Sequence, residues 1–268
     1  MKGATDNVIR CTWAEGELLV DRDAIVTEVP VALVYNGVSH VVMMATPADL
    51  EDLGLGFSLS EGILQRPQDL LDLEVHERLQ GIELALTISA GAFAALRERR
   101  RNLVGRTGCG LCGIESLEQA LPEPASVSSD LQLSHRALQR AIVQLGKRQS
   151  LKHLTGGVHG ATWCTAAGAV ELLREDVGRH NALDKLLGAL QRDGCSQAGF
   201  VLVTSRASYE MVAKSARCGI ALLAAVSAPT SLAVRQAELS GLTLVGFVQP
   251  GRQVVYTRPE RLLGDPIP

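Results

Sequence analysis

Two cysteines separated by two residues are the most chemically suggestive feature of the sequence. They are Cys109 and Cys112. Four glycines frame them: Gly105, Gly108, Gly110 and Gly113. A thiolate is the nucleophile in sulfur transfer, and a nearby cation such as Arg106 favours that charged form. The glycine density predicts a mobile loop, in which a sulfur-bearing thiol can meet first a donor and then an acceptor.

The same cysteine spacing has other interpretations. It is half of a zinc site, which needs two further ligands, and neither His159 nor any other cysteine has partner spacing. It is also the spacing of a dithiol redox pair, but thioredoxin-like pairs lie at a strand-to-helix junction of a βαβ unit, and this one does not. Spacing alone therefore leaves sulfur transfer, redox chemistry and zinc binding open.

A second group of polar residues opens a predicted helix in the C-terminal half. Residues 175–185 have the sequence EDVGRHNALDK. His180 and Asp184 are four residues apart and share a helix face. Arg179, together with the free amides at the helix start, predicts an anion site. The alternative is an ordinary capped helix with surface ion pairs.

A second junction of the same form follows the predicted strand 200–204. Ser205 and Arg206 come directly after this strand, and a helix is predicted over 209–217. The alternative is simple N-capping by Ser208. In a parallel sheet both junctions lie at carboxyl ends of strands, where open α/β sheets bind ligands. The glycine turn at Gly156-Gly157, followed by His159, is expected to join them at this edge.

Hydrophobic periodicity divides the chain into two parts. Before residue 125, short β-rich runs are punctuated by an Asn-Gly turn at residues 36–37, and a helix is expected from Thr46 as its cap to about Leu64. The predicted strands are 24–29, 31–35, 40–44, 71–77 and 82–88, with a second helix at 92–100. We expect residues 1–125 to form an N-terminal β-rich α+β subdomain that carries the cysteine loop at about 101–114.

From residue 126 onward, helices alternate with strands. Helices are predicted at 134–147, 181–192, 209–217 and 232–239, and strands at 161–165, 169–173, 200–204, 220–226 and 242–248. Short connections between alternating elements predict a mostly parallel sheet with helices on both faces. We expect residues 126–268 to form a three-layer α/β domain.

Composition excludes several classes of function. The chain of 268 residues has a net charge of −3 and 3% aromatic residues, which argues against a nucleic-acid partner. Its longest apolar run, residues 220–226, is too short to span a bilayer, and the first ten residues lack the apolar core of a signal peptide. The sequence therefore predicts a cytoplasmic protein with no membrane partner.

Taken together, these motifs resemble the formate dehydrogenase accessory sulfurtransferase family, FdhD. The resemblance is strongest over residues 175–185 and extends over roughly residues 20–260. Its other parts, in the family's order, are GCGLCG at 108–113, TGGVH at 155–159, Ser205-Arg206 with YEMV at 209–212, Gly246-Phe247 and VYT at 255–257.

The resemblance implies a sulfur carrier. Members accept a persulfide sulfur from a cysteine desulfurase and deliver it to the molybdenum bis(molybdopterin guanine dinucleotide) cofactor that formate dehydrogenase needs. The family's persulfide carrier matches Cys109, with Cys112 as an assisting thiol. A segment assigned to cofactor binding matches Phe247, Val248, Gln249, Pro250, Gly251 and Arg252. We expect the rim residues Arg179, His180, Ser205, Arg206, Gly156, Gly157 and His159 to bind the same cofactor.

The resemblance also carries implications for fold and assembly. The C-terminal domain is expected to resemble the cytidine deaminase fold without its zinc signature, so no permanently bound metal is expected. The family suggests a homodimer. Two rival functions remain: a zinc-binding α/β enzyme with Cys109 and Cys112 as ligands, and a non-catalytic cofactor chaperone that uses only the rim.

Overall fold

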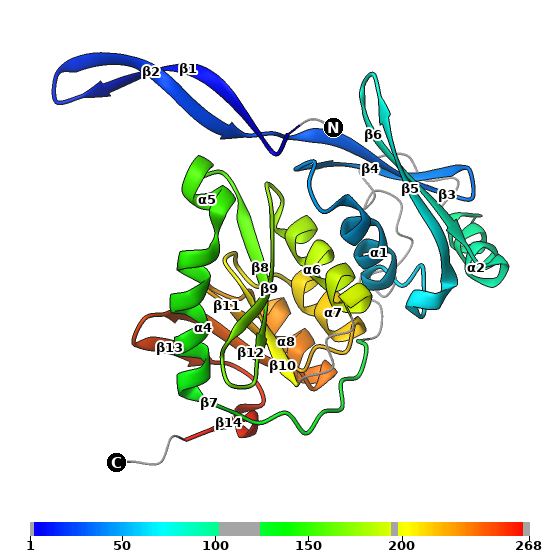
Figure 1. Cartoon of the computed structure of the whole chain (residues 1–268). Helices are drawn as coiled ribbons and strands as arrows, with labels where there is room; N and C mark the ends of the chain where they lie inside the picture. The colour runs from blue at the N-terminus through cyan, green and yellow to red at the C-terminus, as the bar shows by residue number, and fades with distance from the viewer. Residues whose placement is uncertain (1–2, 102–123, 194–197, 265–268) are drawn as a thin grey trace.

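The computed structural model describes residues 3–101, 124–193 and 198–264 and has a mixed α/β fold built on two main sheets (Figure 1). A four-stranded sheet lies in the N-terminal part and a six-stranded sheet in the C-terminal part. Each sheet has its own cluster of buried hydrophobic side chains. The predicted α/β fold is confirmed, and the domain boundary at residue 125 stays a prediction.

The four-stranded sheet has the strand order β4-β3-β6-β5. Its strands are β3 (Val29–Tyr35), β4 (Val38–Ala45), β5 (Leu70–Arg78) and β6 (Gly81–Ile88), with a short 3-10 helix, η1 (Pro67–Asp69), before β5. Asn36 and Gly37 join β3 to β4 with positive φ angles of 46° and 79°, as an Asn-Gly hairpin turn requires. Helices α1 (Leu50–Ser60) and α2 (Ala90–Arg101) contribute Leu53 and Leu96 to the core of this part.

An N-terminal hairpin precedes this sheet and extends away from the body of the molecule (Figure 1). It consists of β1 (Thr5–Ala14) and β2 (Glu17–Val26), which pair only with each other. The sequence predicts only its last residues, 24–26, as strand. Apolar and polar residues alternate over residues 9–13 of β1, but β2 has three apolar residues at 18–20 followed by three charged residues at 21–23. None of its residues belongs to either hydrophobic cluster.

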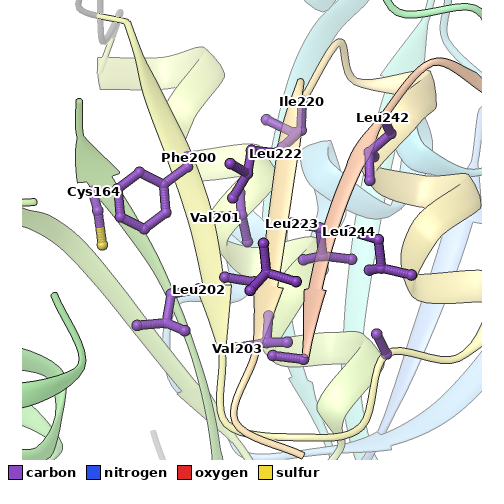
Figure 2. Close-up of a cluster of buried hydrophobic side chains, with 14 of the residues drawn as sticks. Cys164, Phe200, Val201, Leu202, Val203, Ile220, Leu222, Leu223, Leu242 and Leu244 are labelled. Atoms are coloured by element: carbon purple, nitrogen blue, oxygen red, sulfur yellow. The ribbon is translucent and has the colours of Figure 1, made fainter. Parts of the chain in front are cut away.

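The six-stranded sheet has the order β13-β12-β11-β10-β8-β9. Its strands are β8 (His159–Thr165), β9 (Val170–Asp176), β10 (Gly199–Val203), β11 (Leu222–Ala225), β12 (Thr243–Gln249) and β13 (Arg252–Val255). Figure 2 shows the apolar side chains of the central strands, including Phe200, Leu202, Leu223 and Leu244. β10 and β11 are buried along their whole length, as strands covered on both faces must be.

The sheet is mixed rather than mostly parallel. β10, β11 and β12 are parallel, whereas β8, β9 and β13 each run antiparallel to the strand beside them. The short connections explain this: residues 166–169 join β8 to β9, and Pro250-Gly251 joins β12 to β13. Such turns allow only antiparallel neighbours, because a parallel pair needs a crossover of a dozen or more residues.

Helices cover both faces of this sheet. They are α4 (His135–Arg148), α5 (Ser150–Thr155), α6 (Arg179–Asp193), α7 (Tyr209–Arg217) and α8 (Ser231–Ser240). In Figure 1, α4 lies on one side of the sheet, and α6, α7 and α8 lie on the other. In the part of the chain that the structure describes, no helix is long and apolar enough to cross a membrane.

Residues 124–132 pack onto the C-terminal part, although Pro124 and the serines at 126, 128 and 129 give them the composition of a linker. Val127 and Leu131 are buried in its hydrophobic cluster. The two-residue strand β7 (Leu133–Ser134) then pairs with β14 (Leu262–Leu263), which follows a second 3-10 helix, η2 (Pro259–Arg261). The polar and proline-rich composition of this segment therefore did not predict that Val127 and Leu131 are buried.

The first helix begins later than predicted. α1 starts at Leu50, with Asp49 at the cap position in the left-handed conformation, and it ends at Ser60 rather than near Leu64. Thr46 does not cap this helix because it is buried against the C-terminal part. Its backbone N–H donates to Asp176 at 3.0 Å, and its hydroxyl accepts from the backbone N–H of Val177 at 3.1 Å. A contact between residues far apart in sequence thus overrides the local capping preference.

Helices α1 and α6 join the two parts by a close crossing at two glycines. A Cβ atom on Gly56 would lie 1.7 Å from the backbone oxygen of Asp184, and one on Gly188 would lie 2.0 Å from that of Asp52. The Asp52 carboxylate accepts from Arg174 and Arg192, each at 2.8 Å. The backbones of the two helices can meet only because neither position carries a side chain.

This crossing predicts that Gly188→Ala destabilises the protein. The added methyl group forces α1 and α6 apart, and overpacking of this kind costs about 1–3 kcal/mol or more in the free energy of unfolding. The matched control is Gly146→Ala in α4, where an added Cβ meets no atom within 4 Å. The control should gain about 0.5–1 kcal/mol from helix propensity. Urea unfolding measures both, and equal stabilities would contradict the close crossing.

Candidate functional site

The predicted rim residues meet at one edge of the six-stranded sheet. β9, β10, β11 and β12 all end at this edge, and β8 begins there. Thr204, just after β10, donates its backbone N–H to the oxygen of Gly160 at 3.0 Å, and its hydroxyl accepts from the N–H of Gly160 at 2.9 Å. The N–H of Phe247 donates to the oxygen of Ser227 at 3.2 Å. These bonds tie the loops of the rim to one another.

Arg179 and His180 are the first two residues of α6, and both are partly buried. Arg179 Nε and His180 Nε2 are shielded from solvent, and neither forms a hydrogen bond within the described residues. His180 Nε2 lies 3.9 Å from a carboxylate oxygen of Glu210. Polar atoms held at the start of a helix suit an anionic ligand, because the first amides of the helix are also donors.

His159 joins this group from the start of β8. Burial, followed by the charge of Arg179, lowers the pKa of both His159 and His180 below the ordinary value of 6.5. Both imidazoles are therefore favoured in the neutral form, in which one ring nitrogen donates and the other accepts. Gly156 and Gly157 are exposed in the turn that precedes His159. A guanidinium and two neutral imidazoles at one edge of the sheet can bind an anion and hydrogen-bond its neutral groups.

Ser205 and Arg206 differ in what they can contribute. Arg206 is exposed at the rim, whereas Ser205 is buried and its hydroxyl donates to the backbone oxygen of Arg206 at 3.0 Å. Ser208 stands at the cap position of α7, but its hydroxyl donates to Glu210 at 2.8 Å rather than capping a backbone amide. Arg206 is therefore the residue of this junction that is free to meet a ligand charge.

The predicted C-terminal binding segment begins at the rim and continues beyond it. Phe247 lies in a β-bulge with a positive φ of 51°, and the guanidinium of Arg252 lies over its ring at 5.4 Å. Val248 is buried, whereas Gln249, Pro250, Gly251 and Arg252 are exposed. The N–H of Gly251 donates to the side chain of Gln139 in α4 at 2.7 Å. This segment offers one ring-and-cation pair next to the rim.

The two acidic residues that begin the motif at 175–185 are structural. Glu175 accepts from the backbone N–H groups of Leu151 and Lys152 at 2.9 and 3.0 Å. Asp176 forms a fully buried ion pair with Lys185 at 2.6 Å. Their hydrogen-bonding capacity is thus used within the protein.

A second buried cluster lies behind the rim, between α6, α7 and α1. Lys214 Nζ lies 3.0 Å from both carboxylate oxygens of Asp184, and Ser60 donates to that carboxylate at 2.6 Å. Burial disfavours the Lys214 ammonium, but Asp184 and Glu61 outweigh it and raise the pKa of Lys214. Asp184 was a candidate in the sequence, but its partners could not be predicted because the three residues come from three separate helices.

Cys109 and Cys112 lie outside the described residues. Cys164 and Cys218 lie within them, and burial raises the pKa of each thiol to about 12, which disfavours a reactive thiolate. Cys11 is exposed on the N-terminal hairpin. Among the described residues, no group of three or more His, Cys, Asp and Glu side chains is placed to hold a metal ion.

A hollow lies at the other end of α7 from the rim. It has a volume of about 430 Å³ and is lined by residues that include Gly62, Arg99, Arg217 and Cys218. Arg99 of α2 donates to the backbone oxygens of Glu61 and Gly62 at 3.3 and 3.1 Å. The end of α2 is thereby held against the end of α1, two residues before the described part of this helix ends.

Comparison with known proteins finds one family over nearly the whole chain. A model of the FdhD/NarQ family matches residues 26–263. The sulfur carrier protein FdhD of Cupriavidus necator is 59% identical over 251 residues, which cover 93% of this chain and 87% of that protein. The protein of the same name from Xanthomonas euvesicatoria pv. vesicatoria is 54% identical over 242 residues, 90% of this chain and 86% of that one.

A solved structure has the same fold. It comes from Desulfotalea psychrophila and is described as a candidate formate dehydrogenase accessory protein. It superposes with a TM-score of 0.77 at 26% sequence identity, covering 97% of this chain and 100% of that one.

The lowered pKa values of His159 and His180 predict a pH dependence of stability. An unfolded histidine binds a proton more readily than these two do in the folded protein. The two histidines therefore leave the free energy of unfolding unchanged above about pH 6.5. They lower it as the pH falls from there toward their pKa values in the folded protein. The double variant His159→Gln/His180→Gln should lose less stability over this range. Urea unfolding at about pH 7.5 and about pH 5.5 measures the difference. Equal losses in the two proteins would contradict the assignment.

Proposed function

This chain belongs to the FdhD/NarQ family, and we propose that it is a sulfur carrier that serves the maturation of formate dehydrogenase. It accepts a persulfide sulfur from a cysteine desulfurase and delivers it to the molybdenum bis(molybdopterin guanine dinucleotide) cofactor. Support comes from relatives named sulfur carrier protein that match at least 90% of this chain at 54–59% identity. The structural observation that carries the proposal is that His159, at the start of β8, and Arg179 and His180, at the start of α6, lie at one edge of the sheet.

We propose that the rim binds the dinucleotide part of the acceptor. A pyrophosphate needs cationic and backbone donors, and the start of α6 provides both. Arg179 brings a guanidinium whose Nε has no hydrogen-bond acceptor among the described residues. A guanidinium can bind phosphate oxygens in a bidentate manner, which a lysine cannot. Arg206 supplies a second positive charge from the adjacent loop.

We propose that the segment from Phe247 to Arg252 extends this site. Phe247 and Arg252 form a ring-and-cation pair at 5.4 Å, which offers a flat surface beside the phosphate donors. An aromatic ring and a guanidinium plane both stack on heterocycles such as guanine or the pterin. The positive φ of Phe247 fixes the direction in which this segment leaves the sheet. The two binding regions are thus held at one edge.

The sulfur itself is proposed to travel on Cys109. The Cys109 thiolate attacks the terminal sulfur of the donor persulfide, the donor's S–S bond breaks, and the donor leaves as a thiolate. The product is a persulfide on Cys109, and no external oxidant or reductant is consumed. Cys112 is proposed to assist as a second thiol. Because burial disfavours the thiolates of Cys164 and Cys218, neither competes for this role.

Finer features of fold and assembly are part of the same proposal. The C-terminal domain, from about residue 126, is proposed to resemble the cytidine deaminase fold, with Arg179 at the start of α6 and Ser205 in the loop before α7 in place of zinc ligands. The parallel strands β10, β11 and β12 and their helices α7 and α8 support this. The family resemblance further suggests a homodimer. Two rivals are tested separately: the following experiment distinguishes the non-catalytic chaperone, and stoichiometric zinc in anaerobically purified protein would favour the zinc enzyme.

Replacement of the proposed sulfur-carrying thiol should abolish sulfur loading. After incubation with a cysteine desulfurase and cysteine, wild-type protein should gain the mass of one sulfur atom, and Cys109→Ala should not. Activation of formate dehydrogenase should be lost in parallel. The matched control is Cys11→Ala, which removes an exposed cysteine from the N-terminal hairpin. An unchanged adduct on Cys109→Ala would refute the assignment, and client activation by this variant would favour the chaperone.

Arg179→Ala should weaken guanine nucleotide binding without affecting Cys109. Loss of a hydrogen bond to a charged phosphate costs about 1.5–3 kcal/mol, which is roughly a tenfold to hundredfold increase in Kd. Calorimetry with GDP measures the change, and the intact cofactor replaces GDP if neither protein binds the nucleotide. The matched control, Arg97→Ala, removes an exposed arginine of α2 and should bind as wild type does. Equal affinity in wild type and Arg179→Ala would remove α6 from the site.

A further inference from the structure

The hairpin of β12 and β13 ends in a turn that a side chain of α4 holds in place. Gly251 has a positive φ of 79°, as the third residue of a type II turn requires, and Pro250 precedes it. The register of the two strands shifts before Gln249, and beyond this shift they pair at Gln249 and Arg252. β13 is also an edge strand of the six-stranded sheet. Contacts from outside the sheet therefore determine the position of the hairpin tip, here defined as residues 249–252.

Gln139 in α4 supplies these contacts. Its Oε1 accepts from the backbone N–H of Gly251 at 2.7 Å. Its Nε2 donates to the backbone oxygen of Arg252 at 3.3 Å and to Oε1 of Gln253 at 2.8 Å. A backbone N–H only donates and a backbone oxygen only accepts, so these two groups fix which way the Gln139 amide points. Both hydrogens of its nitrogen are thereby used on the hairpin.

The amide of Gln139 is also held from the helix side. The hydroxyl of Ser134 caps the start of α4, and Leu138, the residue before Gln139, is fully buried in the hydrophobic cluster. Gln253 Nε2 lies 2.7 Å from Nδ1 of His135 in the first turn of α4. Because Oε1 of Gln253 faces Gln139, its Nε2 donates to His135, and Nδ1 of the imidazole accepts. The hairpin is thus connected to a helix that is itself fixed in the core.

We propose that Gln139 is a positioning residue for the site that binds the acceptor cofactor. The inference rests on the proposed function, in which Phe247 and Arg252 bind a heterocycle of that cofactor. Gln139 holds the backbone of Arg252, and the guanidinium of this arginine lies over the Phe247 ring at 5.4 Å. A shift of the tip moves the guanidinium off the ring, and the flat surface for the heterocycle is lost. Gln139 acts on the ligand through the tip.

A second glutamine of α4 holds a different turn in the same way and provides a matched control. Gln144 Nε2 donates to the backbone oxygen of Gly168 at 3.0 Å, and its Oε1 accepts from the N–H of Val170 at 3.2 Å. These bonds hold the turn between β8 and β9, which lies at the opposite end of β8 from the rim. Both glutamines are half-buried. Loss of either amide removes comparable hydrogen bonds, but of the two only Gln139 bonds to the proposed binding segment.

Calorimetry with GDP tests the role of Gln139 at the site. Gln139→Ala should raise the Kd roughly twofold to tenfold, the range for loss of an aromatic contact, and Gln144→Ala should bind as wild type does. Alanine favours a helix, so both variants should fold. In a double-mutant cycle, Gln139→Ala should add no loss to Arg252→Ala but should keep its full factor on top of Arg179→Ala. A glutamine with a general structural role would give the same factor in both backgrounds.

Amide exchange at Gly251 tests the same contact without a ligand. Followed by NMR in the whole chain, it should be severalfold faster in Gln139→Ala than in wild type or Gln144→Ala, because its hydrogen-bond acceptor is removed. Unchanged exchange, or wild-type GDP affinity in Gln139→Ala, would overturn the positioning role alone. Equal affinity in wild type and Arg252→Ala would instead refute the proposed binding segment, and with it the role of Gln139. The intact cofactor replaces GDP if the wild type does not bind the nucleotide.

Discussion

The buried ion pair between Asp176 and Lys185 is the interaction on which the geometry of the rim depends. Both side chains are completely buried and 2.6 Å apart. Asp176 also accepts from the backbone of Thr46 and Gly178 and from the side chain of Asn181, at 2.7–3.0 Å. Removing one member of such a pair leaves an uncompensated buried charge, at a cost of about 3–5 kcal/mol. The start of α6 is thereby fixed to the N-terminal part.

Two further contacts fix the N-terminal part to the helix that opens at the rim. At the crossing of α1 and α6, the missing side chains of Gly56 and Gly188 let the helix backbones touch. Behind it, Asp184 binds both Ser60 of α1 and Lys214 of α7. Contacts with the N-terminal part therefore hold α6 near its start, at Asp184 and at Gly188. We infer that a carrier whose thiol and acceptor site belong to different parts of the chain needs this rigidity to bring them into a reproducible relation.

The sequence predicted the residues of the rim better than it predicted the contacts that hold α6 against the N-terminal part. Strand-to-helix alternation located the starts of α6 and α7, because local periodicity and strand order determine where those junctions lie. It could not show that Asp176 accepts a hydrogen bond from Thr46 and forms an ion pair with Lys185, since Thr46 and Asp176 are 130 residues apart. Most of the hairpin of β1 and β2 was not predicted because β2 has runs of apolar and charged residues, at 18–20 and 21–23, instead of the alternation typical of a half-buried strand. The roles of the predicted site residues stay predictions, and Cys109 and Cys112 lie outside the described residues.

The central claim is that one chain loads sulfur on Cys109 and releases it at a rim that contains Arg179. A chase experiment tests this most directly: protein carrying the sulfur adduct is mixed with the unsulfurated molybdenum cofactor, and the adduct is followed by mass spectrometry. Wild type should lose the adduct as the cofactor gains sulfur, whereas Arg179→Ala should load normally and retain it. Loss of the adduct at the same rate in both proteins would contradict the account.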